Sequence, residues 1–177
     1  MSSSYLESVK KQFSLYRSLG EKTINLVEEE KLFWRYNPES NSISVIVQHL
    51  WGNMLSRWTH FLTEDGEKEW RNRDTEFEEV IKTKEELLIK WNAGWDCLFN
   101  TLLTLKSDDL DRTIYIRTEP LTAMDAINRQ LAHYASHVGQ IIFLGKMILG
   151  DRWISLSIPR GKSHEYNMRN TDSSTKK

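Results

Sequence analysis

Apolar residues recur at intervals of three and four over four long stretches of the chain, and this spacing predicts four amphipathic helices. The stretches cover residues 4–27, 42–62, 83–105 and 122–150. Residue types that commonly cap helices begin the last three stretches and end the last, namely Ser42, Thr83, Thr122 and Gly150. Because almost no strand pattern accompanies them, the chain is predicted to be an all-α four-helix bundle.

The second and third connections are long enough to cross from one end of such a bundle to the other, so a simple up-down topology is not implied. Residues 67–82 are charged with few apolar positions, which predicts a strap lying across a bundle end. Residues 111–117 alternate in character and predict a short hairpin or an extended loop. We expect a single domain over residues 1–166, followed by a disordered polar tail over residues 167–177.

Charge and cysteine content narrow the class of protein. The formal net charge is −1, from 24 basic and 25 acidic residues without a sustained basic stripe, so no nucleic-acid partner is expected. The single cysteine, Cys97, cannot form an internal disulfide and is interpreted as structural. The apolar run at residues 141–149 is too short to span a bilayer, and residues 1–7 do not resemble a signal peptide. We therefore expect a cytoplasmic protein with no membrane partner.

Two histidines in the fourth stretch, His133 and His137, are four residues apart and therefore lie on one face of a helix. Their neighbours in register straddle the apolar stripe, so the rings are expected to point inward or at the edge of a cleft. Burying two imidazoles without partners is costly, whereas a metal ion uses their lone pairs. Metal ligands are favoured over histidines satisfied in the core or on a solvated face. Tyr134 follows His133, so the His-Glu-x-x-His motif of zinc proteases, with its built-in general base, is not present.

His49 and His60 compete for the position of third ligand. They are eleven residues apart in one predicted helix, which separates them by about 16 Å along its axis, so only one can serve. His49 is favoured because Gly52 and Asn53 follow one turn later, leaving room and an amide beside an open coordination position. His60 adjoins a charged loop, and His164 is most simply a surface residue. Three protein ligands leave a coordination position open, as in catalytic zinc sites.

These residues resemble a known family. The segment Ile46-Val47-Gln48-His49-Leu50, together with the pair His133 and His137, resembles the DinB-like superfamily of bacterial bundle proteins over about residues 5–149. Four further segments are similar to one DinB-related subfamily: Gln48-His49-Leu50-Trp51-Gly52-Asn53, Asp65-Gly66-Glu67-Lys68, Arg71-Asn72-Arg73-Asp74 and Leu156-Ser157-Ile158-Pro159-Arg160-Gly161-Lys162-Ser163.

The resemblance implies a bundle with crossover connections, often dimeric, that holds a divalent metal ion on His49, His133 and His137. Zinc or nickel is the expected ion, with iron or manganese as alternatives. Members of the superfamily include S-transferases that use bacillithiol or mycothiol and a mycothiol-dependent maleylpyruvate isomerase. The leading hypothesis is therefore a metal-dependent thiol S-transferase, in which the ion lowers the pKa of a low-molecular-weight thiol. A metal-dependent hydrolase or isomerase and a non-catalytic, stress-associated or interaction module remain alternatives.

The sequence also suggests candidates for a catalytic residue, for substrate binding and for self-association. Asn53 is the candidate catalytic residue near the open position, and the other catalytic residues are not identified. Arg71 and Arg73, or Lys162 from the C-terminal segment, would hold an anionic small-molecule substrate if residues 65–79 and 153–162 pack beside the histidines. Helices one and three are unusually aromatic, which together with the resemblance predicts a homodimer. The aromatic residues concerned are Tyr5, Phe13, Tyr16, Trp91, Trp95 and Phe99.

Overall fold

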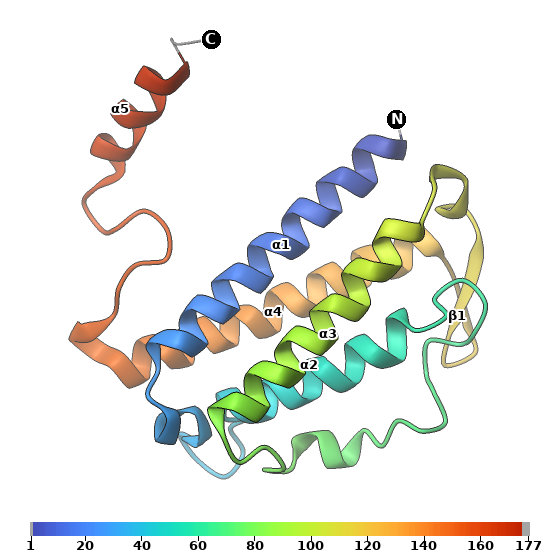
Figure 1. Ribbon diagram of the computed structural model, residues 1–177, viewed down its shortest axis with the longest axis horizontal. Helices are drawn as coiled ribbons and strands as arrows, with labels where there is room; N and C mark the ends of the chain where they lie inside the picture. The colour runs from blue at the N-terminus through green and yellow to red at the C-terminus, as the bar shows by residue number, and fades with distance from the viewer. Residues whose placement is uncertain (1, 175–177) are drawn as a thin grey trace.

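The computed structural model describes residues 2–174 and is mainly α-helical, as predicted. Its four long helices are α1 (Ser2–Leu26), α2 (Ile43–Trp58), α3 (Lys84–Thr104) and α4 (Ala123–Leu149). Helix α2 packs chiefly on α3, and α1 packs chiefly on α4 (Figure 1). The predicted caps are present, since the side chains of Ser42, Thr83 and Thr122 accept hydrogen bonds from backbone amides of the first turns.

Helix α2 ends earlier than the apolar pattern predicts. The pattern continues to residue 62, but the helix stops at Trp58 because Thr59 is extended and His60 has a φ of 52°. The amides of Thr63 and Glu64 both donate to the carbonyl of His60, which closes a turn in place of a further helical turn.

The charged connection lies alongside α2 and not across a bundle end, which corrects the position expected for it. Its 3₁₀ helix η2 (Asp74–Phe77) contacts the middle of α2, where Gly52 leaves room for the side chain of Glu76. A Cβ atom at residue 52 would collide with that carboxyl group. The strap, residues 67–82, is therefore held against the same helix that carries His49.

Of the two alternatives predicted for residues 111–117, a short hairpin or an extended loop, the structure has a hairpin, which extends beyond that range. Its strands β1 (Thr113–Ile116) and β2 (Glu119–Thr122) pair antiparallel. Three further 3₁₀ helices complete the connections, η1 (Glu29–Phe33), η3 (Ser107–Asp109) and η4 (Gly150–Arg152). The hairpin lies at the end of the molecule where α4 begins (Figure 1).

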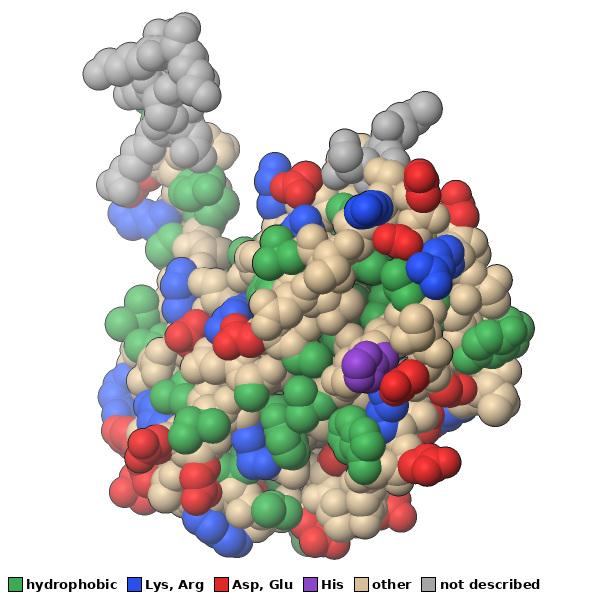
Figure 2. Space-filling model, turned by 45° about the vertical axis from the view of Figure 1, so that its right-hand side comes forward, with side chains coloured by type: hydrophobic (Ala, Val, Ile, Leu, Met, Phe, Trp, Pro, Cys, Tyr) green, Lys and Arg blue, Asp and Glu red, His purple; other side chains and the backbone are tan. Residues whose placement is uncertain are grey.

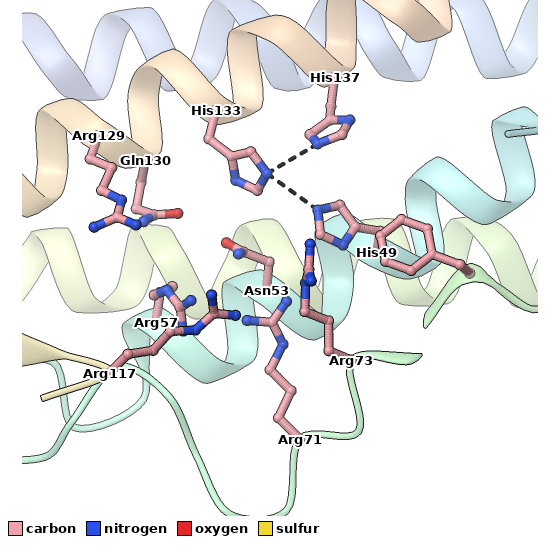
Figure 3. A pocket seen from close by; sticks show the side chains of 11 residues that line it. His49, Asn53, Arg57, Arg71, Arg73, Arg117, Arg129, Gln130, His133 and His137 are labelled. Atoms are coloured by element: carbon pink, nitrogen blue, oxygen red, sulfur yellow. Dashed lines mark hydrogen bonds between the residues drawn. The ribbon is translucent and has the colours of Figure 1, made fainter. Parts of the chain in front are cut away.

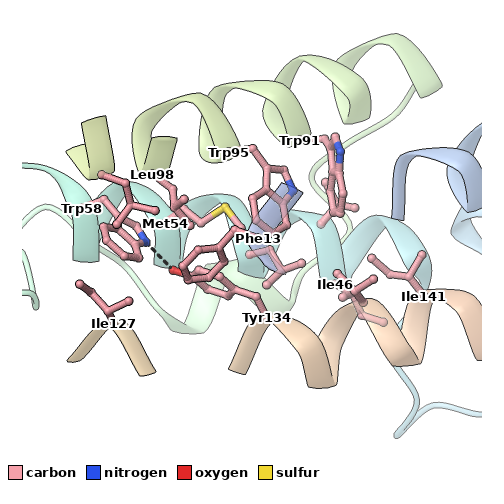
Figure 4. Close-up of a cluster of buried hydrophobic side chains, with 14 of the residues drawn as sticks. Phe13, Ile46, Met54, Trp58, Trp91, Trp95, Leu98, Ile127, Tyr134 and Ile141 are labelled. Carbon is pink, nitrogen blue, oxygen red and sulfur yellow. Dashed lines mark hydrogen bonds between the residues drawn. The ribbon is translucent and has the colours of Figure 1, made fainter. Parts of the chain in front are cut away.

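The centre of the core is aromatic. Phe13, Trp58, Trp95 and Tyr134 are fully buried and pack ring against ring between the helices (Figure 4). The hydroxyl of Tyr134 accepts from Trp58 Nε1 at 3.0 Å and donates to Asn53 Oδ1 at 3.0 Å. Of the aromatic residues expected to favour a dimer, Phe13, Trp91 and Trp95 lie in this core, and the others pack against it. The aromatic residues of α1 and α3 are therefore used in packing within the chain itself.

The C-terminal segment differs from expectation in two ways. Residues 163–174 form helix α5 (Ser163–Ser174) where disorder is predicted from residue 167, and no glycine or proline follows Gly161 to interrupt it. Residues 175–177 lie outside the described part of the chain. Trp153 packs against the core as expected, whereas Ile158 is 39% exposed.

The surface is mixed in charge. Figure 2 shows Lys and Arg side chains interspersed with Asp and Glu, and small hydrophobic groups between them. No helix in the described part of the chain is long and apolar enough to cross a membrane.

Candidate metal centre

His49 of α2 and the pair His133 and His137 of α4 point toward one another from facing helices (Figure 3). The Nε2 atom of His133 lies 3.2 Å from Nε2 of His49 and 3.0 Å from Nε2 of His137. The ligand atoms of all three lie within 4.8 Å of one another. The four-residue spacing on one helix therefore produces the convergence that the sequence predicts.

The hydrogen bonds made by the opposite ring nitrogens fix where the lone pairs point. Nδ1 of His49 lies 2.9 Å from a carboxylate oxygen of Glu76, and Nδ1 of His137 lies 3.1 Å from Oε1 of Gln140. Because both oxygens are acceptors, both Nδ1 atoms carry the proton, and both Nε2 atoms present lone pairs to His133. A neutral His133 carries at most one proton on Nε2 and can donate a hydrogen bond to the Nε2 atom of either His49 or His137, but not to both.

This donor set fits a divalent cation. Tetrahedral zinc with Zn–N bonds of about 2.0–2.1 Å places ligand nitrogens about 3.3 Å apart. The separations from His133 Nε2 to the other two Nε2 atoms, 3.2 and 3.0 Å, are close to this value. Burial, followed by the adjacent His137 and His49, lowers the pKa of His133 to about 3. Burial, followed by His49, also lowers the pKa of His137. His133 and His137 are therefore neutral, which is the form of an imidazole that binds metal.

A buried carboxylate supports the site from behind. The side chain of Glu76 is 5% exposed and accepts from Arg71 through both oxygens, at 2.7 and 2.9 Å, as well as from His49. Burial raises the pKa of Glu76, but the hydrogen bonds from Arg71 and His49 outweigh it and hold the pKa below its usual value. The other side of His49 stacks on Phe77, with ring centroids 5.0 Å apart. Carboxylate–histidine pairs of this kind orient metal ligands.

Glu76 is one of the site residues that sequence reasoning missed, because the pattern of the strap is that of a solvated charged loop. The predicted substrate residue Arg71 is also placed differently from expectation. Its side chain is only 2% exposed and is bound to Glu76, so Arg71 supports the ligand shell, whereas Arg73 is exposed at the cavity.

The fourth side of the histidine cluster opens into a cavity of about 330 Å³. Asn53 lines it, 5% exposed, with its Oδ1 occupied by Tyr134, so the amide nitrogen is the group left to donate to a bound molecule. The lining comprises the three histidines, Asn53, Phe77, Gln130, Arg57, Arg71, Arg73, Arg117 and Arg129 (Figure 3).

Three other candidates lie elsewhere. The side chain of His60 is 65% exposed and lies 4.0 Å from Glu64, and His164 is exposed on α5. Lys162, expected beside the site, instead pairs with Glu165 at 2.6 Å, and no described residue after His137 lines the cavity. The strap therefore reaches the histidines, but the C-terminal segment, which leaves the far end of α4, does not.

The chain belongs to a family described as Protein of unknown function (DUF1572), whose profile matches residues 1–162. No curated protein matches the chain.

Proposed function

We propose that this chain is a metal-dependent enzyme with a DinB-like four-helix bundle, and that His49, His133 and His137 hold its divalent ion. The observation that supports this most strongly is the convergence of three Nε2 atoms, two of them with lone pairs fixed by Glu76 and Gln140. Zinc or nickel suits three imidazoles best, and iron or manganese remains an alternative.

Thiol S-transfer is the proposed reaction. When bound, the ion would supply Lewis-acid chemistry, lowering the pKa of a thiol at the open position so that a thiolate is available near neutral pH. Three side chains would bind and orient the reactants: Glu76 orients His49, the amide of Asn53 donates a hydrogen bond to the bound molecule, and Arg73 binds an anionic group. A bacillithiol-type thiol is the proposed co-substrate, on the strength of the DinB resemblance. Hydrolysis and isomerisation remain alternatives.

A non-catalytic metal-binding module is the rival function. Such a site would be closed by a fourth protein ligand. Among the described residues, no further His, Cys, Asp or Glu joins the three histidines as a ligand, and a cavity adjoins them. These observations favour the enzyme.

Cytoplasmic localisation and a homodimer remain predictions. Because the aromatic residues of α1 and α3 belong to the core of the chain itself, the dimer now rests on the family resemblance alone. Light scattering should give twice the chain mass of 20.9 kDa.

Metal analysis of the purified protein tests the site. Wild type should hold close to one divalent ion per chain, and His137→Ala should lose most of it, whereas His60→Ala should match wild type. Equal metal content in His137→Ala and wild type would show that the ligand set is wrong. A conjugation screen with bacillithiol then tests the reaction, since turnover that needs both thiol and metal is expected only of the S-transferase.

A further inference from the structure

The cavity beside the histidines has a strongly one-sided charge. Within residues 2–174, five arginines line it and no acidic residue does. They come from separate parts of the fold: Arg57 from α2, Arg71 and Arg73 from the strap, Arg117 from the hairpin turn and Arg129 from α4 (Figure 3). A chain of net charge −1 has therefore concentrated positive charge at one place.

Two carboxylates behind the wall neutralise only part of this charge. Glu67 accepts from Arg57 at 3.1 Å and from Arg117 at 2.8 Å, while Glu76 is bound to Arg71. Burial, and next the charge of Arg71, lowers the pKa of Arg57. The positive charges thus act on one another across the cavity, and a further anion would relieve that repulsion.

Three guanidinium groups have donors available to such an anion. Arg73 makes no ion pair with any residue in the described range and lies 5.7 Å from the Phe77 ring. Arg129 has only a 3.6 Å pair with Glu119, in which both side chains are at least half exposed, and pairs of that kind contribute little. Nη1 of Arg71 is buried without a hydrogen-bond partner and lies 3.7 Å from Glu67. A buried charged donor normally has a partner, so this atom independently indicates a ligand.

We propose that the cavity binds a small molecule with at least two anionic oxygen-bearing groups, either carboxylates or phosphates, directly beside the three histidines. Arg73 and Arg129 lie on different sides of the cavity, so a single anionic group cannot satisfy both (Figure 3). Arg71 Nη1 donates to the more deeply bound group. Planar guanidinium groups suit both carboxylate and phosphate oxygens. As an assignment of substrate class this rests on the proposed function, whereas the binding site is independent of it.

Calorimetric titration with two probes, tricarballylate and inorganic pyrophosphate, tests the site. Wild type should bind at least one of them more tightly than about 1 mM, and whichever binds more tightly identifies carboxylate or phosphate as the preferred group. The double variant Arg73→Gln/Arg129→Gln should bind that probe at least roughly tenfold more weakly because it loses two charge-assisted contacts. The control Arg152→Gln/Arg160→Gln removes the same charge outside the cavity and should bind within about twofold of wild type.

The same titration on His133→Ala separates the arginines from the metal. Affinity retained in His133→Ala and lost in Arg73→Gln/Arg129→Gln supports the proposal. Affinity lost in His133→Ala and retained in the arginine double variant shows that the probe binds through the ion, and it overturns the proposal. The proposal is also overturned if the control variant loses as much affinity as the arginine double variant, or if neither probe binds to wild type. Metal content is measured alongside: a wild type without metal contradicts the proposed enzyme, while arginine-dependent binding would still establish the anion site.

Discussion

The orientation of His49 depends on a residue 27 positions away in the sequence. Glu76 accepts the Nδ1 proton of His49 while Arg71 holds both of its oxygens. The imidazole is thereby fixed in the tautomer that presents its Nε2 lone pair, and the ligand becomes more basic. The carboxylate can remain charged in this buried place because a guanidinium neutralises it.

Replacing Glu76 with Gln should weaken metal binding about 10- to 100-fold. The amide can still accept from His49, but it is neutral and can no longer accept from Arg71 through two oxygens. Competition with a chromogenic chelator measures the affinity, and circular dichroism verifies that the variant is folded. Glu78→Gln, exposed in the same strap, is the matched control and should bind as wild type does. If Glu76→Gln also binds as wild type does, the carboxylate has no part in the site.

Single residues show what local patterns can and cannot predict. The pair His133 and His137 is visible in the sequence because helical spacing alone brings the two rings together. Glu76 is not, because no periodicity relates the strap to α2. Arg71 and Arg73 read alike in the sequence, and only the packing of the strap makes one a buried support and the other an exposed donor.

At the scale of elements, the hairpin and the start of the strap depend on one carboxylate. Arg117 and Thr118, in the hairpin turn, have φ values of 55° and 64°, which are costly for residues other than glycine. Asp65 accepts from the amides of both, at 2.8 and 2.7 Å, and from the amide of Glu67. These hydrogen bonds stabilise the strained turn and place Arg117 at the cavity.

Asp65→Ala should lower the free energy of unfolding by about 1–3 kcal/mol at pH 7, since it leaves three amides without their acceptor. Burial raises the pKa of Asp65, but hydrogen bonds from the backbone amides of Glu67, Thr118 and Arg117 outweigh it and lower the pKa. Because the folded-state pKa lies below the unfolded value of about 3.9, the contribution of the charge is present above that pH. It is lost as the pH falls through the folded-state pKa.

Urea unfolding at pH 7 and at pH 3 measures this difference between variant and wild type. The difference should be larger at pH 7. Asp108→Ala, at an exposed position in η3, is the control and should cost little at either pH. An equal cost for Asp65→Ala at both pH values would contradict the role assigned to the carboxylate charge.

The elements themselves are predictable to different degrees. The helices follow from periodicity and capping, because both are properties of a few consecutive residues. The end of α2 does not, since the positive φ of His60 interrupts an apolar pattern that continues beyond it. Nor does the path of the strap, which depends on the space that Gly52 leaves for Glu76.

At the scale of the whole molecule, amphipathic stripes predict that helices pack together but not which pairs do so. Helix α2 packs on α3 through one face, and it also supplies His49 to the site and contacts the strap. The hairpin and α4 close the remaining sides of the cavity. A site built from four separate segments becomes visible only when those segments are placed in space.

The C-terminal segment provides a test of where the packed structure ends. Residues 161–168 are exposed, whereas Trp153 packs against the core and lies close to Gly145. Truncation after Lys162 should therefore shift the melting temperature by less than about 2 °C, because little apolar surface is lost. Trp153→Ala should destabilise the protein by about 1–3 kcal/mol, since it removes a large ring from that contact. Differential scanning calorimetry compares the two. If the truncated chain loses as much stability as Trp153→Ala does, α5 contributes to the packed structure as much as that ring does, which contradicts the prediction.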